Sequence, residues 1–469
     1  MDPKEQTPQS APVAVSFYEK HKKIYIRDVK GWWNTWRWVL VWVTQILFYG
    51  APWLEWNGRQ AVLMHLVERK FYLFGLVLWP QDVFYLALLL IISAYALFLF
   101  TAIAGRLFCG YACPQTVYTE IFMWVENKIE GDRSARMKLD KGPMTARKIG
   151  LKAIKHAIWL LISLWTGFTL VAYFTPVDEL LAALPFGFSG WELFWTFFYG
   201  GFCYMQAGFL REQVCKYMCP YARFQSAMFD KDTLVVTYDS QRGEPRGARS
   251  KKVVDYKAAG LGDCIDCSLC VQVCPTGIDI RNGLQYECIG CGLCVDACNS
   301  VMDKVNYPRG LIRFATQNAM TQHWGRAEIV RRVLRPRVLF YSSVLVGLSV
   351  AMLVSMATRV PLKVDVVRDR AALSRMVAGG KLENVYSLQI MNATEATQRY
   401  RISATGLQEL QVASDPEVEI GPAESRWVSV QLQIPYGSAS SGSHPVFFEV
   451  HNTAGDDKVV EKSVFLVPR

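Results

Sequence analysis

Cysteine is absent from the last 171 of the 469 residues, and all thirteen cysteines lie between Cys109 and Cys298. Thiols that hold metal clusters must stay reduced, so we expect the stretch that contains them to face the cytoplasm. A cysteine-free tail suits an oxidising compartment. The first 30 residues are polar and lack the short apolar core of a signal peptide, so the first membrane segment should be an uncleaved anchor.

Apolar residues are abundant: 51% of the chain is hydrophobic and 13% is aromatic. The chain is too apolar and too long for one soluble domain, so several membrane spans should coexist with at least one soluble domain. We predict about five transmembrane helices from the length of the apolar runs, at residues 36–56, 83–104, 153–174, 191–210 and 338–358. Residues 61–74 have helical spacing and are expected to form a helix at the membrane interface.

The net charge of +10 is distributed unevenly along the chain. The region before Pro361 carries +12 (40 Lys and Arg minus 28 Asp and Glu), and the remainder carries −2 (11 minus 13). Basic chains often bind nucleic acid, but the positive-inside rule explains the basic loops here better, and no nucleic-acid partner is expected. The rule places the amino terminus and residues 105–152 and 212–337 inside, and the tail from residue 360 outside.

Eight cysteines between residues 264 and 298 form two copies of the spacing C-x2-C-x2-C-x3-C. Tandem copies are typical of ferredoxins with two [4Fe-4S] clusters, in which the fourth cysteine of each run ligates the other cluster. A zinc ribbon also uses C-x2-C pairs, but two identical four-cysteine runs favour clusters. Asn299 follows the second run where proline is usual, and that position is not a ligand. The predicted ligand sets are Cys264, Cys267, Cys270 and Cys298 for one cluster, and Cys288, Cys291, Cys294 and Cys274 for the other.

A second cysteine pattern, C-x3-C-P, occurs twice, each time five residues after the predicted end of an even-numbered span. The two copies read Cys109-Gly-Tyr-Ala-Cys113-Pro114 and Cys215-Lys-Tyr-Met-Cys219-Pro220. Residues four apart share a helix face, and proline favours the first turn of a new helix, which places the second cysteine of each pair at a helix amino terminus. If the repeat packs about a pseudo-twofold axis, four thiolates meet and favour a soft metal such as Cu(I).

Two other interpretations of these four cysteines remain open: a redox disulfide within each pair, or buried cysteines without a chemical task. Cys203 has no partner by spacing and is expected to serve packing. Met205 and Met218 are candidate soft ligands, although core filling is the simpler role. For His156, a satisfied interfacial histidine is favoured over a quinone or metal contact.

The tail predicts short alternating strands at 385–391, 399–404, 417–420, 427–434, 446–451 and 459–467, as in a small immunoglobulin-like sandwich. The organisation expected from these patterns has five parts: a flexible cytoplasmic leader (1–30), a four-helix membrane domain (31–211), a cytoplasmic region (212–337) with the ferredoxin at 260–302, a fifth transmembrane helix (338–358), and a periplasmic sandwich (360–469). The fold class is a multi-domain α-helical membrane protein with an inserted two-[4Fe-4S] ferredoxin domain and a C-terminal immunoglobulin-like β-sandwich.

On the two cysteine patterns, the spans and the sandwich tail, the chain resembles the cytochrome c oxidase accessory proteins of the FixG/CcoG (RdxA) family, which are related to NapH-like and NosR-like membrane ferredoxins. The resemblance implies an oxidoreductase of the bacterial inner membrane. Its activity would be the reduction of Cu(II) to Cu(I) for copper insertion during assembly of cbb3-type cytochrome c oxidase. The residues that match the copper motif are Cys109, Cys113, Cys215 and Cys219.

We expect electrons to pass from an unidentified cytoplasmic donor through the clusters to copper, since each cluster carries one electron and Cu(II) requires one. The implied partners are copper ion, oxidase assembly factors or a copper chaperone, the membrane and, as a further candidate, a second copy of the chain. Two other classes remain open. One is a membrane quinol dehydrogenase, and the other is a non-enzymatic assembly scaffold or copper chaperone with structural clusters.

Overall fold

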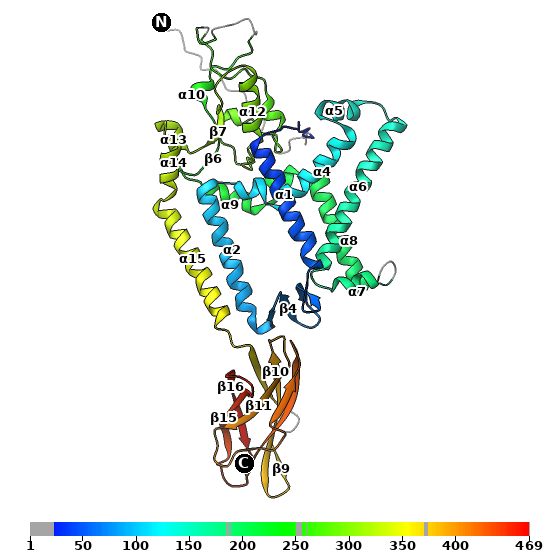
Figure 1. Cartoon of the computed structure of the whole chain (residues 1–469), viewed down its shortest axis with the longest axis vertical. Helices are drawn as coiled ribbons and strands as arrows, with labels where there is room; N and C mark the ends of the chain where they lie inside the picture. Colours follow the sequence, from blue (N-terminus) through cyan, green and yellow to red (C-terminus); the bar gives the residue numbers. More distant parts are fainter. Residues whose placement is uncertain are drawn as a thin grey trace, which may run out of the picture.

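The computed structural model describes residues 23–183, 187, 189–249, 256–258, 260–369 and 374–468. The molecule is elongated, with the ferredoxin region at one end, long helices in the middle and a β-sandwich at the other end (Figure 1). The ferredoxin and the sandwich therefore lie at opposite ends of the helices. Of the predicted leader, residues 1–22 fall outside the described part of the chain.

Helices occur at all five predicted spans: α1 (Trp32–Gly50), α2 (Val83–Ala104), α6 (Ala146–Val171), α8 (Gly190–Met205) and α15 (Pro336–Ala357). Among the described residues, three helical segments are long and apolar enough to cross a membrane: Pro80–Ala104, Ala146–Val171 and Pro336–Ala357. α1 has 19 residues, and α8 has 16 before it continues as a π-helical segment, η3 (Gln206–Leu210). The count of five spans stays a prediction.

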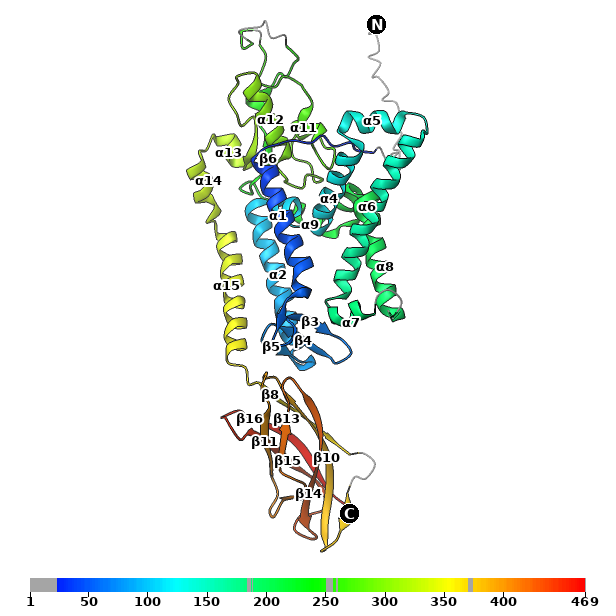
Figure 2. The same ribbon diagram turned by 45° about the vertical axis from the view of Figure 1, so that its right-hand side comes forward.

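Glycines allow α6 and α8 to approach closely. A Cβ atom at Gly167 would lie 2.2 Å from the carbonyl oxygen of Thr196, and one at Gly200 would lie 3.1 Å from that of Ser163. Small residues at helix contacts are typical of membrane bundles, where close packing drives association. α2 instead pairs with α15, on the other side of α1 (Figure 2).

The predicted interfacial helix at 61–74 is wrong, because this stretch forms strands. β1 (Glu55–Trp56) pairs with β2 (Arg59–Gln60), and β3 (Val62–His65), β4 (Lys70–Leu73) and β5 (Leu76–Leu78) form a second small sheet. Arg69 and Phe74 have positive φ values of 56° and 53° at the turns between those three strands. Leu63, Tyr72 and Val77, one from each of these three strands, lie side by side and pack against Met391 of the sandwich. The apolar spacing therefore serves a strand face.

Residues 23–30 form an extended, packed segment that runs from beside α5 (Arg133–Lys141) to the start of α1 (Figure 2). The Arg27 amide donates to the carbonyl of Gln272 (2.9 Å), and the hydroxyl of Tyr25 donates to Asp140 (2.8 Å). The prediction of a flexible leader is therefore wrong for this part of the chain.

The ferredoxin region is inserted between α9 (Pro220–Met228) and α15. β6 (Val235–Tyr238) pairs with β7 (Ile312–Ala315), and the short helices α11 (Leu269–Gln272) and α12 (Leu293–Lys304) pack beside each other. α13 (Gln317–Gln322) and α14 (Arg326–Val333) connect the ferredoxin region to α15.

The tail is a sandwich of two antiparallel sheets, as predicted. One sheet has the order β12-β14-β10-β8, with β9 paired to β10, and the other has the order β13-β11-β15-β16. All six predicted strands are present; β8, β9 and β12 were not predicted. Alternate residues such as Leu388, Val430 and Phe448 are fully buried between the sheets. The strands are β8 (Leu362–Arg368), β9 (Arg375–Val377), β10 (Lys381–Asn392), β11 (Gln398–Thr405), β12 (Gln411–Val412), β13 (Glu417–Ile420), β14 (Ser425–Pro435), β15 (Gly442–Asn452) and β16 (Lys458–Val467).

Candidate redox and metal site

Two cavities in the described part of the ferredoxin region divide the eight cysteines. Each is small, about 20 Å³, and has mainly apolar walls. The first is bordered by Cys270, Cys274, Cys288, Cys291 and Cys294, and the second by Cys264, Cys267, Cys270 and Cys298. Cys270 lies between the two cavities. The division matches the two predicted ligand sets, and four thiols around each apolar cavity fit a [4Fe-4S] cluster.

The two cysteine runs share a backbone conformation that wraps each cavity. Asp266 and Ser268 in the first run have positive φ values of 53° and 55°, and Gly290 and Gly292 have 66° and 75° at the corresponding places of the second run. A Cβ at Gly292 would lie 2.7 Å from the Trp33 ring, so α1 packs closely on this loop. The second run is pressed against α1, and it has glycine at this contact.

The C-x3-C-P cysteines lie at matching places in the two repeats. Cys109 is in α3 (Leu107–Tyr111), and Cys113 directly precedes α4 (Pro114–Glu130). Cys215 is in the π-helical segment η4 (Val214–Met218), and Cys219 directly precedes α9. Proline is the first residue of both α4 and α9, as the sequence predicts.

The four sulfurs of the two motifs lie near one another. Burial raises the pKa of Cys109 to about 12, the negative charges of Cys113, Cys215 and Cys219 raise it as well, and Arg106 lowers it. The Cys109 thiol also donates to Oε1 of Gln225 in α9 (3.3 Å), which links the two repeats. All thirteen cysteines are described and none forms a disulfide.

This thiol group is wider than the coordination sphere of one ion. Among the described residues, no three His, Cys, Asp or Glu side chains converge closely enough to hold a single metal ion. The predicted convergence of the four thiolates on one metal ion therefore stays a prediction.

The first motif packs directly on the loop of the first cavity. A Cβ at Gly110 would lie 2.8 Å from the carbonyl oxygen of Ile289 and 3.0 Å from Cα of Cys291, so α3 touches the loop backbone. The Tyr111 hydroxyl donates to the carbonyl of Cys291 (3.0 Å). Cys109 and Cys291 belong to one buried apolar cluster. The motif and the ferredoxin thus share a dry, close-packed interface.

Arg37 of α1 is a further residue of this interface, which our sequence reasoning missed. Its side chain is only 2% exposed, its Nε donates to the carbonyl of Gly110 (3.3 Å), and it pairs with Glu120 of α4 (2.9 Å). The sequence did contain a signal for this residue, a single arginine inside an apolar run. A charged side chain in such a run is energetically unfavourable and is usually paired with an opposite charge.

Comparisons with known proteins agree with this organisation. Three family models match: a 4Fe-4S binding domain at residues 86–131, a 4Fe-4S dicluster domain at 210–317, and the IG-like fold at the C-terminal of FixG at 352–468. The chain is 38% identical to the nitrogen fixation protein FixG of Rhizobium meliloti over 443 residues, which cover 86% of this chain and 83% of that protein. The chain belongs to the FixG/RdxA family.

Other relatives show which parts are shared. Protein RdxA of Cereibacter sphaeroides is 37% identical over 437 residues, which cover 90% of this chain and 91% of RdxA. The ferredoxin-type protein NapH of Escherichia coli is 24% identical over 278 residues, which cover 53% of this chain and 90% of NapH. The predicted family is confirmed, and this FixG/RdxA-family member is an iron–sulfur electron-transfer protein with apolar helices and a C-terminal Ig-like domain.

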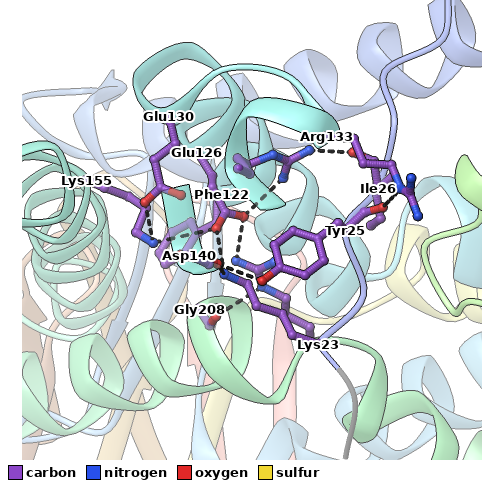
Figure 3. A network of polar contacts seen from close by, with 12 residues as sticks. Lys23, Tyr25, Ile26, Phe122, Glu126, Glu130, Arg133, Asp140, Lys155 and Gly208 are labelled. Atoms are coloured by element: carbon purple, nitrogen blue, oxygen red, sulfur yellow. Dashed lines mark hydrogen bonds and ion pairs between the residues drawn. The ribbon is translucent and has the colours of Figure 1, made fainter. Parts of the chain in front are cut away.

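A buried ionic network fixes the repeat around the site in this FixG/RdxA-family member (Figure 3). Glu126 of α4 is fully buried and pairs with Arg211 (3.0 Å), Arg136 (3.3 Å), Lys155 (3.5 Å) and Lys23 (3.5 Å). Burial opposes its ionisation, but these four cations outweigh it and lower the pKa of Glu126 to about 2. The network ties α4, α5, α6 and the extended segment 23–30 together at the level of the C-x3-C-P motifs.

Four other predicted candidates lie outside the thiol group. Nδ1 of His156 is hydrogen-bonded to the hydroxyl of Tyr204 (2.9 Å), and the imidazole lies edge-on to Trp159, as expected for a satisfied histidine. Cys203 borders a cavity between the helices that also has Ala112 and Pro114 in its wall. Met205 and Met218 are exposed.

Proposed function

We propose that this protein is a membrane-bound oxidoreductase that reduces Cu(II) to Cu(I), which is then inserted during assembly of cbb3-type cytochrome c oxidase. One observation carries the proposal: α3, which contains Cys109, packs on the loop that contains Cys291. Electron tunnelling falls steeply with distance, so a redox reaction at the C-x3-C-P thiols is best served by direct contact with the ferredoxin. The 4Fe-4S binding-domain model at residues 86–131 includes Cys109 and Cys113, which also associates the motif with redox proteins.

Copper is the substrate, and the thiols of Cys109, Cys113, Cys215 and Cys219 are its proposed ligands. Thiolate prefers Cu(I) to harder ions, so binding there favours the reduced product. Each Cu(II) takes up one electron, and the electron comes from a cytoplasmic one-electron reductant. A bound pair of [4Fe-4S] clusters supplies one-electron transfer. The residues that would hold them are Cys264, Cys267, Cys270 and Cys298, and Cys288, Cys291, Cys294 and Cys274.

The chain's own residues shape the transfer region. Arg37 and Tyr111 hold α3 against the loop, and the apolar cluster of Cys109 and Cys291 excludes water from the contact.

We further propose an inner-membrane protein with the ferredoxin in the cytoplasm and the sandwich in the periplasm. The two domains lie at opposite ends of the helices, and the arginine-rich approach to α15 lies at the ferredoxin end (Figure 1). The sandwich is then free to contact an oxidase assembly factor, a copper chaperone or a second copy of the chain.

The test is anaerobic Cu(I) production by the purified full-length protein, which is first reduced with dithionite and then freed of excess dithionite before Cu(II) is added, with a Cu(I)-chelating dye as the reporter. Replacing Cys109, Cys113, Cys215 and Cys219 together by serine should abolish the protein-dependent rate. Cys203→Ser is the matched control, because it removes a thiol of the same membrane region outside the motifs, and it should keep the rate. Normal turnover in the four-serine variant would remove the proposed role of these thiols.

A further inference from the structure

A cavity of about 390 Å³ lies among α1, α4, α6 and α8, beside the first C-x3-C-P motif. Ala112 and Pro114, the two neighbours of Cys113, form part of its wall, and most of the remaining wall is apolar. Gln45 borders this cavity and also a larger one of about 800 Å³ whose lining includes four tryptophans. The space beside the motif thus adjoins a wide apolar space within the predicted membrane region.

Polar groups at one part of the cavity form a directed chain. The Thr166 hydroxyl donates to the carbonyl of Ile162 (2.8 Å), so it must accept the hydrogen bond from Tyr49 (2.8 Å). Tyr49 is then left to accept from the hydroxyl of Tyr118, at a long 3.4 Å. Tyr118 lines the cavity, and its hydroxyl oxygen can therefore still accept a hydrogen bond from a ligand.

Gln45 gives a second, independent indication of a ligand. Its Oε1 is buried and has no hydrogen-bond partner among the described residues. A buried acceptor without a partner is unfavourable, and a ligand hydroxyl at this position would supply the missing hydrogen bond.

We propose that the cavity binds the ring of a lipid-soluble quinol, with its tail in the larger cavity, and that the quinol is a second source of electrons, in addition to the cytoplasmic donor, for copper at the adjacent motif. The redox part of this inference rests on the proposed function. A quinol ring is flat and apolar, needs acceptors for its hydroxyls when reduced, and needs donors for its carbonyls when oxidised. The Gln45 amide and the Tyr118 hydroxyl supply both kinds of group. A phospholipid chain would fill the apolar walls but leave Oε1 of Gln45 unpaired.

The size of the cavity and the chemistry of the step are consistent with this ligand. Small-molecule sites are mostly apolar clefts of about 300–1,000 Å³ with a few placed polar groups. Oxidation of one quinol breaks two O–H bonds and releases two protons to water and two electrons. Each electron reduces one Cu(II) to Cu(I), so one quinol serves two copper ions.

The first experiment measures binding of decylubiquinol, kept reduced under anaerobic conditions, to the full-length protein in detergent without copper, by equilibrium dialysis. We expect saturable binding with one ring per chain, weakened about 3- to 10-fold by Gln45→Leu and by Tyr118→Phe, because each removes a hydrogen bond. Tyr95→Phe in α2 is the matched control and should bind as the wild type does. Size-exclusion profiles identify any variant that fails to fold. Thr166→Val then takes the place of that variant, because it removes the hydrogen bond that holds Tyr49 and should also weaken binding.

Unsaturable partitioning, or equal affinity in all variants, would overturn the quinol site. So would equal displacement by a phospholipid that lacks the ring, because this outcome identifies an acyl-chain site. A second measurement adds anaerobic decylubiquinol and Cu(II) with the Cu(I) dye. The protein should raise the rate of Cu(I) formation above the protein-free rate, and two Cu(I) should form for each quinol oxidised. If binding is ring-specific but no reductant yields Cu(I), the copper proposal fails alone. If the dithionite-reduced protein yields Cu(I) but ring-specific binding is absent, the quinol inference fails alone.

Discussion

Gly110→Ala is the substitution that most directly probes the contact between the copper motif and the ferredoxin. The new Cβ would lie 2.8 Å from the Ile289 oxygen and 3.0 Å from Cα of Cys291, and both are backbone atoms. To reach the 3.4 Å limit of ordinary contact, α3 and the loop must separate by about 0.6 Å. Overpacking of this kind typically lowers the free energy of unfolding by about 1–3 kcal/mol. Replacing glycine by alanine within a helix raises it by up to about 1 kcal/mol.

We therefore expect Gly110→Ala to lower the free energy of unfolding by about 0–2 kcal/mol and to slow copper reduction. Gly150→Ala in α6 is the control, because no described heavy atom lies within 4 Å of its new Cβ. It should be neutral or stabilising and keep the wild-type rate. The assay combines thermal unfolding in detergent with Cu(I) production. If Gly110→Ala matched Gly150→Ala in both, the close packing of α3 on the loop would be refuted.

Three further substitutions test the surrounding contacts. Arg37→Met should lower the unfolding temperature strongly, since removing one partner of a buried pair costs about 3–5 kcal/mol, and adding Glu120→Gln should recover part of the loss. Glu126, with its pKa lowered from 4.5 to about 2, contributes stability above about pH 4.5 that is lost as the pH falls towards 2. A pH titration of intrinsic fluorescence should show this acid-dependent loss in the wild type and a flatter profile in Glu126→Gln. Asp82, 2% exposed and paired with Arg359 (2.9 Å), joins the β3–β5 sheet to the start of the sandwich. Asp82→Asn should speed limited proteolysis between α15 and the sandwich, and unchanged cleavage would contradict this coupling.

The spacing of residues close together in the sequence predicted the features that depend only on such neighbours. Ligation of a cluster by three close cysteines requires a fixed spacing, so the sequence assigned Cys288, Cys291 and Cys294 to one set and placed Cys274 with them. Proline at the first helical position predicted the starts of α4 and α9. Alternation predicted the long strands of the sandwich, whose inward residues must be apolar.

Contacts between distant segments could not be predicted in the same way. Gly110 faces Ile289 across 179 positions of sequence, and nothing in the local pattern indicates that pair. The strands at 62–78 are three or four residues long, too short for the period of their apolar residues to distinguish a strand from a helix. The segment 23–30 is polar, and its order depends on partners such as Asp140 and Gln272.

The most direct measurement is stopped-flow absorbance on anaerobically reduced full-length protein after addition of Cu(II), with Cu(I) trapped by a chelating dye. The account predicts that iron–sulfur absorbance reports oxidation at the same rate as Cu(I) forms, and that both signals vanish in the variant with serine at Cys109, Cys113, Cys215 and Cys219. Iron–sulfur centres that stay reduced after Cu(II) addition, while Cu(I) still forms or never forms, would contradict electron transfer from the ferredoxin to copper.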